Sequence, residues 1–371
     1  MHDAADAWLA EERALAPRVW EERPFPAASL AHGQAGLAFA LVEHFRLSGE
    51  ARSLDRARQH VLAAQRLAER SSVDAFTCAR GPASPYPLSV LEGGVFTGFA
   101  GIGYVLALVG SAQRDDEVVG EGVAMIDRGF ALARESAPRV TELFAGLAGY
   151  VALAEDLARR GIVLPAVTEV GERAASLLID NLGAQSPGEC LGAAHGRAGE
   201  LLALVRHTTR DTERLSGWIE DQRARARRSG PYVLWPTRVG GPVPGNLWWS
   251  FCNGVTGQAL LFTEACRVGP TRERLRDLAA GAVRSLEGIE MPAVANICCG
   301  AAGQAVALDH FARVAGEPRE RAWARLDLAR GNAETLDRWS LLQGRLGIDW
   351  LRLLADHRHP LFVPLLFEPP N

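Results

Sequence analysis

The chain has 371 residues, of which 23% are charged and 48% hydrophobic, and its net charge is −4. This composition suits a globular protein with a large core. No uncharged apolar run reaches the ~18 residues of a membrane-spanning helix, so no membrane span is expected.

The basic residues are all arginine, 40 in number, and the chain has no lysine. With many Ala and Gly, this indicates a GC-rich bacterial genome. The arginines alternate with Asp and Glu along probable helices, and we expect no nucleic-acid binding. The first residues, 1–13, are mixed and acidic and do not resemble a signal peptide, so we predict a cytoplasmic protein.

After an N-terminal helical extension predicted over residues 1–29, a Gly-x-x-Gly turn followed by an apolar, Ala- and Leu-rich run recurs along the chain. Seven copies at roughly regular spacing indicate a repeat architecture. We expect the glycines to provide turns with positive φ and to let neighbouring backbones approach closely. The seven turns are residues 33–36, 98–101, 146–149, 196–199, 254–257, 300–303 and 344–347.

Amphipathic stretches separate these copies, with apolar residues at helical spacing and charged residues between them. The runs that follow the glycine turns are apolar on all sides, which is typical of buried helices. The amphipathic stretches are residues 54–69, 117–134, 167–182, 211–228, 272–287 and 318–330.

These alternating helices predict an all-α fold, a double-layered α/α toroid of seven inner and about seven outer helices in one domain over residues 1–371. An open array would carry polar caps at both ends, and the terminal copies here are as apolar as the central ones. In either case each buried helix begins at its glycine turn and directs free N–H groups toward the same end of the array.

The longest interruption is an insertion at residues 230–249, which is rich in Gly, Pro and Trp and runs directly into Cys252. Its Gly, Pro and β-branched content predicts a loop with short strands. Two interpretations of Trp235, Trp248 and Trp249 stay open: they form a wall that grips a peptide, or they only pack the loop onto the helices.

Three cysteines stand at the entrances of two consecutive buried helices. Cys252 belongs to the fifth turn, and Cys298 and Cys299 belong to the sixth. Three thiolates with an open fourth position form the pattern of a catalytic zinc site. The alternative is a reduced cysteine pair with an unrelated Cys252. A disulfide between Cys298 and Cys299 is a further, minor alternative.

Three polar residues precede other turns. His195 lies directly before Gly196, at the place that Cys299 has in its own copy, and is a candidate acid or base. His32 shares that place in the first copy, and a packing or capping role is the alternative for both histidines. Glu142 precedes the third copy; its sequence context alone favours a solvated charge.

With these turns the sequence resembles the lanthionine synthetase C-like family, from about residue 30 to residue 354. Three motifs carry the resemblance together with the seven glycine turns: residues 194–196 resemble the family's His-Gly, 251–254 its Trp-Cys-x-Gly, and 298–300 its Cys-His-Gly. The family's fold is a seven-plus-seven α-toroid with one zinc ion.

The resemblance implies a zinc-dependent cyclase of dehydrated precursor peptides. Cys252, Cys298 and Cys299 would bind one Zn²⁺, whose open position takes a substrate cysteine. That thiolate would add to dehydroalanine or dehydrobutyrine, forming a lanthionine or methyllanthionine ring. His195 would protonate the resulting enolate, with help from Glu142.

The sequence departs from the family's pattern at three positions. Cys299 replaces the usual histidine ligand, as in a Cys-Cys-Gly subgroup of the family, and Glu142 replaces an aspartate. Trp248 stands where the family often has an arginine, for which Arg238 is a candidate substitute.

The other functional interpretations keep the same fold. One is an enzyme that adds glutathione or another thiol to dehydrated residues, and another is a non-catalytic, zinc-stabilised toroid that binds a modified peptide. No segment resembles a dehydratase, so a separate dehydratase enzyme or domain is the expected partner.

Overall fold

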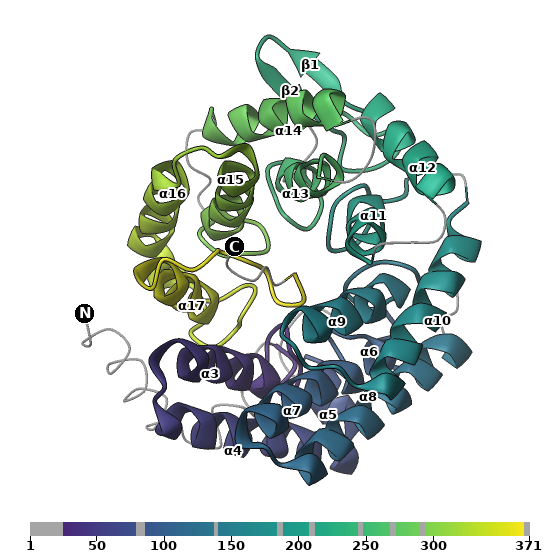
Figure 1. Ribbon diagram of the computed structural model, residues 1–371, viewed down its shortest axis with the longest axis vertical. Coiled ribbons are helices and arrows are strands. Elements are labelled where there is room, and N and C mark those ends of the chain that lie inside the picture. Colours follow the sequence, from purple (N-terminus) through teal and green to yellow (C-terminus); the bar gives the residue numbers. More distant parts are fainter. Residues whose placement is uncertain are drawn as a thin grey trace. The chain divides into compact units, whose positions relative to one another are not determined.

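The computed structural model describes residues 25–78, 86–136, 140–183, 188–207, 212–243, 248–267, 272–288 and 294–366. Most of the predicted N-terminal extension therefore lies outside the described residues. Within them the regular secondary structure is almost entirely helical, with one two-stranded sheet (Figure 1). None of these helices combines the length and apolar character that a bilayer crossing demands.

A helix follows each of the seven glycine turns and begins directly after the first glycine of its turn. The seventh is not buried on all sides as predicted, since its first residue, Arg345, is exposed. We call these seven helices the repeat helices. The first glycine is the N-cap residue in every case and has extended backbone angles. They are α3 (Gln34–Ser48), α7 (Phe99–Gln113), α9 (Leu147–Arg159), α11 (Arg197–Arg206), α13 (Val255–Ala265), α15 (Ala301–Ala315) and α17 (Arg345–Asp356).

The glycines of these turns serve close packing. None of them has a positive φ, so the expectation of left-handed turns is wrong. A Cβ on Gly199 would lie 1.8 Å from the carbonyl oxygen of Ala193, far inside van der Waals contact. The second glycine thus lets the first turn of its helix press onto the backbone of the preceding loop.

Six long amphipathic helices alternate with the repeat helices, and each packs on the repeat helix that precedes it (Figure 1). Two short helices, α5 (Ser72–Phe76) and α6 (Leu88–Gly93), fill the long interval between the first two copies. The long ones are α4 (Ala51–Arg70), α8 (Asp116–Ser136), α10 (Pro165–Asn181), α12 (Thr212–Ala224), α14 (Arg272–Glu287) and α16 (Glu320–Gly331).

The amphipathic helix predicted over residues 211–228 is shorter than expected. Helix α12 ends at Ala224, and an antiparallel hairpin follows, formed by β1 (Arg227–Ser229) and β2 (Tyr232–Leu234). Gly230 in the connecting turn has a φ of 58°, a conformation that glycine adopts without strain. The hairpin confirms short strands at the start of the predicted insertion.

Internal contacts divide the chain into two compact units, one of residues 1–137 with 337–358 and the other of residues 138–336 with 359–371. In the first unit, α17 packs against α3, and the Leu342 N–H donates to the Ala31 carbonyl over 3.1 Å. The seventh copy is thus a neighbour of the first, as a closed array requires and an open one does not. In the second unit, α9, α11, α13 and α15 pack in consecutive order. The single domain stays a prediction.

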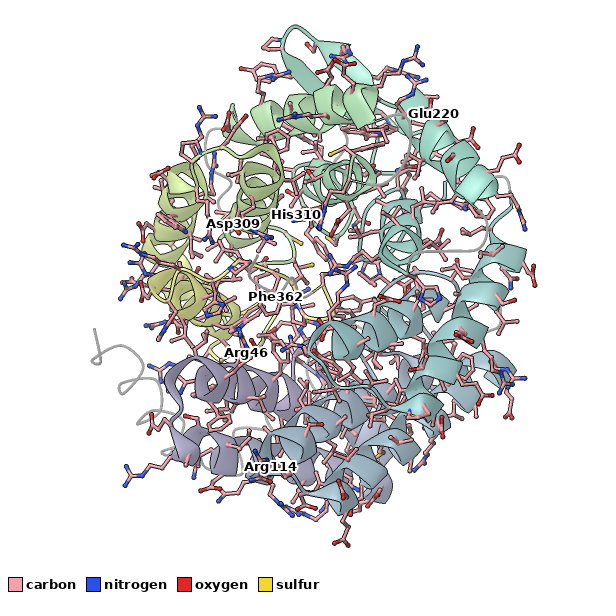
Figure 2. The ribbon with its side chains drawn as sticks, in the orientation of Figure 1. Arg46, Arg114, Glu220, Asp309, His310 and Phe362 are labelled. Atoms are coloured by element: carbon pink, nitrogen blue, oxygen red, sulfur yellow. The ribbon has the colours of Figure 1, made fainter. Side chains whose placement is uncertain are left out.

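The carboxylate of Asp309, fully buried on α15, anchors the C-terminal segment 359–366 (Figure 2). It accepts the Leu361 N–H over 2.9 Å and pairs with the guanidinium groups of Arg313 and Arg319. Arg319 also donates to the carbonyl oxygen of His359 over 2.6 Å. The segment is therefore attached to the second unit by a buried, charge-assisted network.

Asp309→Asn is expected to destabilise the second unit by about 3 kcal/mol, because it removes the carboxylate charge with which the half-buried guanidinium groups of Arg313 and Arg319 pair. Chemical denaturation measures this loss, and Asp55→Asn on the exposed face of α4 is the control, with a change within about 0.5 kcal/mol. Equal stability of the two variants would show that the network does not hold the segment.

Candidate metal centre

Four consecutive glycine turns of the second unit are joined edge to edge by backbone hydrogen bonds. In each turn, the residue two positions before the first glycine takes part. This shared register brings side chains from separate repeats to one place. The donors and acceptors are Phe144 N–H to Ala194 O, Ala193 N–H to Phe251 O, Ala194 N–H to Cys252 O, and both Phe251 and Cys252 N–H to Cys298 O, all between 3.1 and 3.2 Å.

The three predicted cysteines meet at this junction. The Sγ atom of Cys299 lies 3.6 Å from Cys252 Sγ and 3.5 Å from Cys298 Sγ, and the three atoms lie within 4.8 Å of one another. All three thiols are free, so the vicinal disulfide is not formed. Cys252 and Cys298 are buried, whereas Cys299 is half-buried. The cluster is therefore accessible on the Cys299 side.

This cluster fits a tetrahedral zinc ion. Zn–S bonds of roughly 2.3 Å at tetrahedral angles separate two sulfur atoms by roughly 3.8 Å, close to the two shorter separations observed. Hydrogen bonds from the Cys298 and Cys299 thiols hold the pKa of Cys252 well below its ordinary value. The same bonds and the nearby negative sulfur raise the pKa of both partners. Three sulfurs, one of which ionises readily, form a site for a thiophilic cation.

Neighbouring polar groups hold the two cysteine turns in position. Asn296 Oδ1 accepts the Cys299 N–H over 2.8 Å, and Ser250 Oγ accepts the Asn253 N–H over 3.1 Å. The indole N–H of Trp249 donates to the Cys299 carbonyl over 2.9 Å. Each turn thus presents its cysteine in a fixed backbone geometry, as metal ligands require.

Gly192 provides a test of how closely the turns must pack. A Cβ there would lie 2.1 Å from the Cys252 carbonyl oxygen and 2.2 Å from Asn253 Cα. Gly192→Ala must displace the turn that carries Cys252, and we expect it to lower both Zn²⁺ bound per chain and stability, the latter by about 1–3 kcal/mol.

The control for Gly192→Ala is Gly217→Ala on α12, where an added Cβ meets no atom within 4 Å. Because alanine favours helix over glycine, this control is expected to be neutral or up to about 1 kcal/mol more stable. Elemental analysis and denaturation compare the two variants. Unchanged metal binding in Gly192→Ala would show that the Cys252 turn tolerates displacement.

His195 and Glu142 form a pair in the same row of turns. His195 Nδ1 lies 3.1 Å from Glu142 Oε2, and the imidazole is partly exposed while the carboxylate is buried. Burial by itself lowers the pKa of His195, but the hydrogen bond and charge of Glu142, with a contribution from Cys252, raise it above 6.5. The pair therefore favours the protonated form of the imidazole more than burial alone would.

Glu142 is buried, so the expectation of a solvated charge, drawn from its sequence context, is wrong. Besides His195, its carboxylate accepts the backbone N–H groups of Phe144 and Ala145. It occupies the same place before its turn as Ser250 and Asn296, four residues before the first glycine, and caps its turn as they do.

His32 makes the same kind of contact in the first unit, but with a neutral partner. Its Nδ1 lies 2.8 Å from Ser340 Oγ, and its ring stacks on Phe25. Ser340 stands four residues before the seventh turn, as Glu142 does before the third. In both contacts a turn histidine meets the residue four positions before a neighbouring turn. That residue is a carboxylate for His195 and a hydroxyl for His32.

The insertion docks beside both parts of the site. Residues 188–191 and 237–239 pair in antiparallel fashion, with Cys190 opposite Arg238, directly before the turn of His195. The guanidinium of Arg238 donates a hydrogen bond to the Gly188 carbonyl oxygen over 2.9 Å. Trp235 is buried and stacks on Phe262, as expected for a packing residue, whereas Trp249 contacts Cys299.

The supporting residues Ser250, Asn296 and Trp249 were absent from the predicted site. A signal for the first two is present in the sequence, since a polar side chain occurs four residues before most of the glycine turns. Trp249 carries no such signal, because its contact depends on how the insertion folds back.

The comparisons with known proteins agree with this architecture. A family model described as "Lanthionine synthetase C-like protein" matches residues 24–348. Eleven chains of solved structures match, among them "Nisin cyclase", with 13% sequence identity, a TM-score of 0.70, and coverage of 97% of this chain and 95% of that chain. No curated protein sequence matches. The likeness confirms the predicted fold class, an all-α α/α toroid.

Proposed function

Because the chain belongs to the lanthionine synthetase C-like protein family, we propose that it is a zinc-dependent lanthipeptide cyclase. Its substrate would be a dehydrated precursor peptide that carries a cysteine and a dehydroalanine or dehydrobutyrine. The product would be a lanthionine or methyllanthionine thioether ring. The dehydratase that supplies the substrate and the cytoplasmic location remain predictions.

The observation that carries this proposal is the junction of three thiols with a histidine–carboxylate pair. Cys252 and His195 belong to neighbouring turns, linked by the hydrogen bond from the Ala194 N–H to the Cys252 carbonyl. A zinc ion bound by Cys252, Cys298 and Cys299 would lower the pKa of a thiol that takes its fourth position. The half-buried Cys299 marks the side from which a peptide reaches that position.

The remaining chemistry is assigned to His195. The substrate thiol loses its proton to solvent, its sulfur bonds to the β-carbon of the dehydro residue, and the C=C electron pair moves to Cα. The protonated His195 donates a proton there and takes one back from solvent, so the net reaction is addition of S–H across the double bond without a co-reactant. Glu142 holds the imidazole by its Nδ1–H and stabilises its charged form, which leaves Nε2–H as the acid.

Two other functions use the same site. An enzyme that adds glutathione to a dehydrated residue needs the same cysteines and the same acid, but takes its thiol from a second molecule. A non-catalytic toroid would keep the zinc and the peptide affinity without turnover. The pairing of Glu142 with His195 beside the cysteines favours an enzyme over the binding function, which does not require such a pair. Between the two enzymes we favour the cyclase on the family assignment.

The first test measures zinc and ring formation together. We expect near one Zn²⁺ per chain and conversion of a synthetic peptide that holds one dehydroalanine and one cysteine. Since ring closure leaves the mass unchanged, N-ethylmaleimide reports it: the cyclised peptide no longer takes up the label. Glutathione adducts would instead add the mass of glutathione, and zinc without either product would favour the binding function.

A further inference from the structure

The segment before the metal site is unusually free of acidic residues. No Asp or Glu occurs between Asp221 and Glu264, although the whole chain has a net charge of −4. The same segment holds five arginines, four of them within residues 223–228. The sequence does contain one local basic cluster, which the expectation of evenly interspersed arginines overlooked. Such one-sided charge creates a surface potential that attracts anionic partners.

Two of these arginines, Arg223 and Arg228, border an open groove of about 360 Å³ between the end of α12, strand β1 and α14. Arg223, Arg228 and Arg274 line it, with Leu278 and a single carboxylate, Asp277, among the other lining residues. We call it the arginine groove. It lies where the C-terminal end of α12 approaches the N-terminal half of α14 (Figure 1).

Part of the positive charge that lines the arginine groove is not neutralised by ion pairs within the part of the chain that the structure describes. Arg223 is paired with Glu220, which lies on α12 (Figure 2). Arg228 and Arg274 are exposed, and neither has an ion pair with any of the residues that the structure describes. Two unpaired guanidinium groups thus face a groove that contains one carboxylate, and they are available for carboxylates of another molecule.

One continuous chain segment connects the arginine groove to the thiol cluster. Strand β1 borders the groove, the hairpin leads into the insertion, and residues 237–239 of the insertion pair with residues 188–191, the segment before His195. The insertion then reaches Trp249, whose indole binds the Cys299 carbonyl. The groove and the metal centre are therefore joined by a single acid-free segment of one compact unit.

We infer that the arginine groove binds an acidic segment of the peptide substrate, outside the residues that form the ring. This inference rests on the proposed function for the identity of the peptide. Guanidinium groups bind carboxylates in planar, bidentate pairs, and exposed pairs of this kind are individually weak and sensitive to salt. Their effect is to raise the concentration of the reacting segment near the site.

The test is a binding experiment with fluorescein-labelled hexaglutamate, with hexaglutamine as the uncharged peptide control. Arg228→Glu/Arg274→Glu is expected to weaken hexaglutamate binding by about tenfold or more at low ionic strength, since two attractive contacts become repulsive. The matched control is Arg66→Glu/Arg70→Glu, which makes the same change in net charge at two exposed positions of α4. It is expected to leave the affinity within about twofold.

The same variants are then assayed with a cyclisable peptide, with and without a hexaglutamate extension. We expect the extension to lower KM for the wild type and not for Arg228→Glu/Arg274→Glu, while kcat and the reaction of the plain peptide are unchanged. Equal weakening in both double variants, or binding of hexaglutamine as strong as that of hexaglutamate, would overturn the inference. So would an extension that binds without changing KM, since the groove would then serve a separate acidic protein.

Failure of this inference is distinguishable from failure of the proposed function. A wild-type protein that closes no ring on the plain peptide contradicts the cyclase function, whatever its affinity for hexaglutamate. If the ring closes normally but Arg228→Glu/Arg274→Glu changes neither hexaglutamate affinity nor KM, only the role inferred for the arginine groove is contradicted.

Discussion

Cys299→Ala is expected to abolish stoichiometric zinc binding and to lower the rate of ring formation at least about 100-fold. Loss of a residue that only supports a metal ligand already costs about 10–100-fold, and Cys299 supplies a sulfur of the cluster itself. Its half-buried position also means that alanine leaves little cavity, so the fold should persist. Elemental analysis and the maleimide assay measure the two effects on one preparation.

Two further variants serve as controls for Cys299→Ala. Cys78→Ala removes a half-buried thiol of the first unit and should retain both zinc and activity. Cys299→His offers a nitrogen ligand, the family's usual one, and should retain zinc. If Cys299→Ala binds zinc as the wild type does, the three-thiolate site is wrong. If it loses zinc and also unfolds, the ion has a structural role.

His195→Gln is expected to lower the rate of ring formation by about 10²–10⁴-fold, the usual contribution of a general acid, while zinc content stays unchanged. Glutamine keeps a hydrogen-bonding group near Glu142 but has no proton to transfer at neutral pH. Single-turnover kinetics with the dehydroalanine peptide measure the effect. His32→Gln is the matched control, because His32 has the same place in its repeat but pairs with the hydroxyl of Ser340.

A wild-type rate in His195→Gln would contradict the role of His195 as the acid. An equal loss in His32→Gln would show that the histidines matter to the turns as structural residues. Zinc content separates these outcomes from damage to the metal centre.

The pH dependence of Glu142→Gln tests how the pair works. Burial lowers the pKa of His195, whereas the hydrogen bond and the charge of Glu142 raise it. Removing the carboxylate charge should therefore lower this pKa. Because an acid works in its protonated form, activity is lost as pH rises through the pKa, and the loss should begin at lower pH in the variant. A midpoint at unchanged or higher pH would contradict this arrangement.

Local patterns in the sequence determined the repeat and its chemistry. The Gly-x-x-Gly turns located all seven repeat helices, because two signals are adjacent in the chain. These are the glycines, which let another backbone approach closely, and the apolar run that follows them. The amphipathic partners followed from their spacing, and 272–287 coincides with α14. Cys252, Cys298 and Cys299 were recognisable because equivalent turns of neighbouring repeats share a position.

The register between turns was decided only by the tertiary structure. That the imidazole of His195 meets the carboxylate of Glu142, 53 residues away, depends on backbone hydrogen bonds between adjacent turns. Burial of Glu142, which its charge argues against, is compensated by two N–H donors of its own turn and by the distant His195. The path of the insertion to Trp249 and the exposure of Arg228 and Arg274 depend likewise on packing between distant segments, so the sequence alone contains no periodic signal for them.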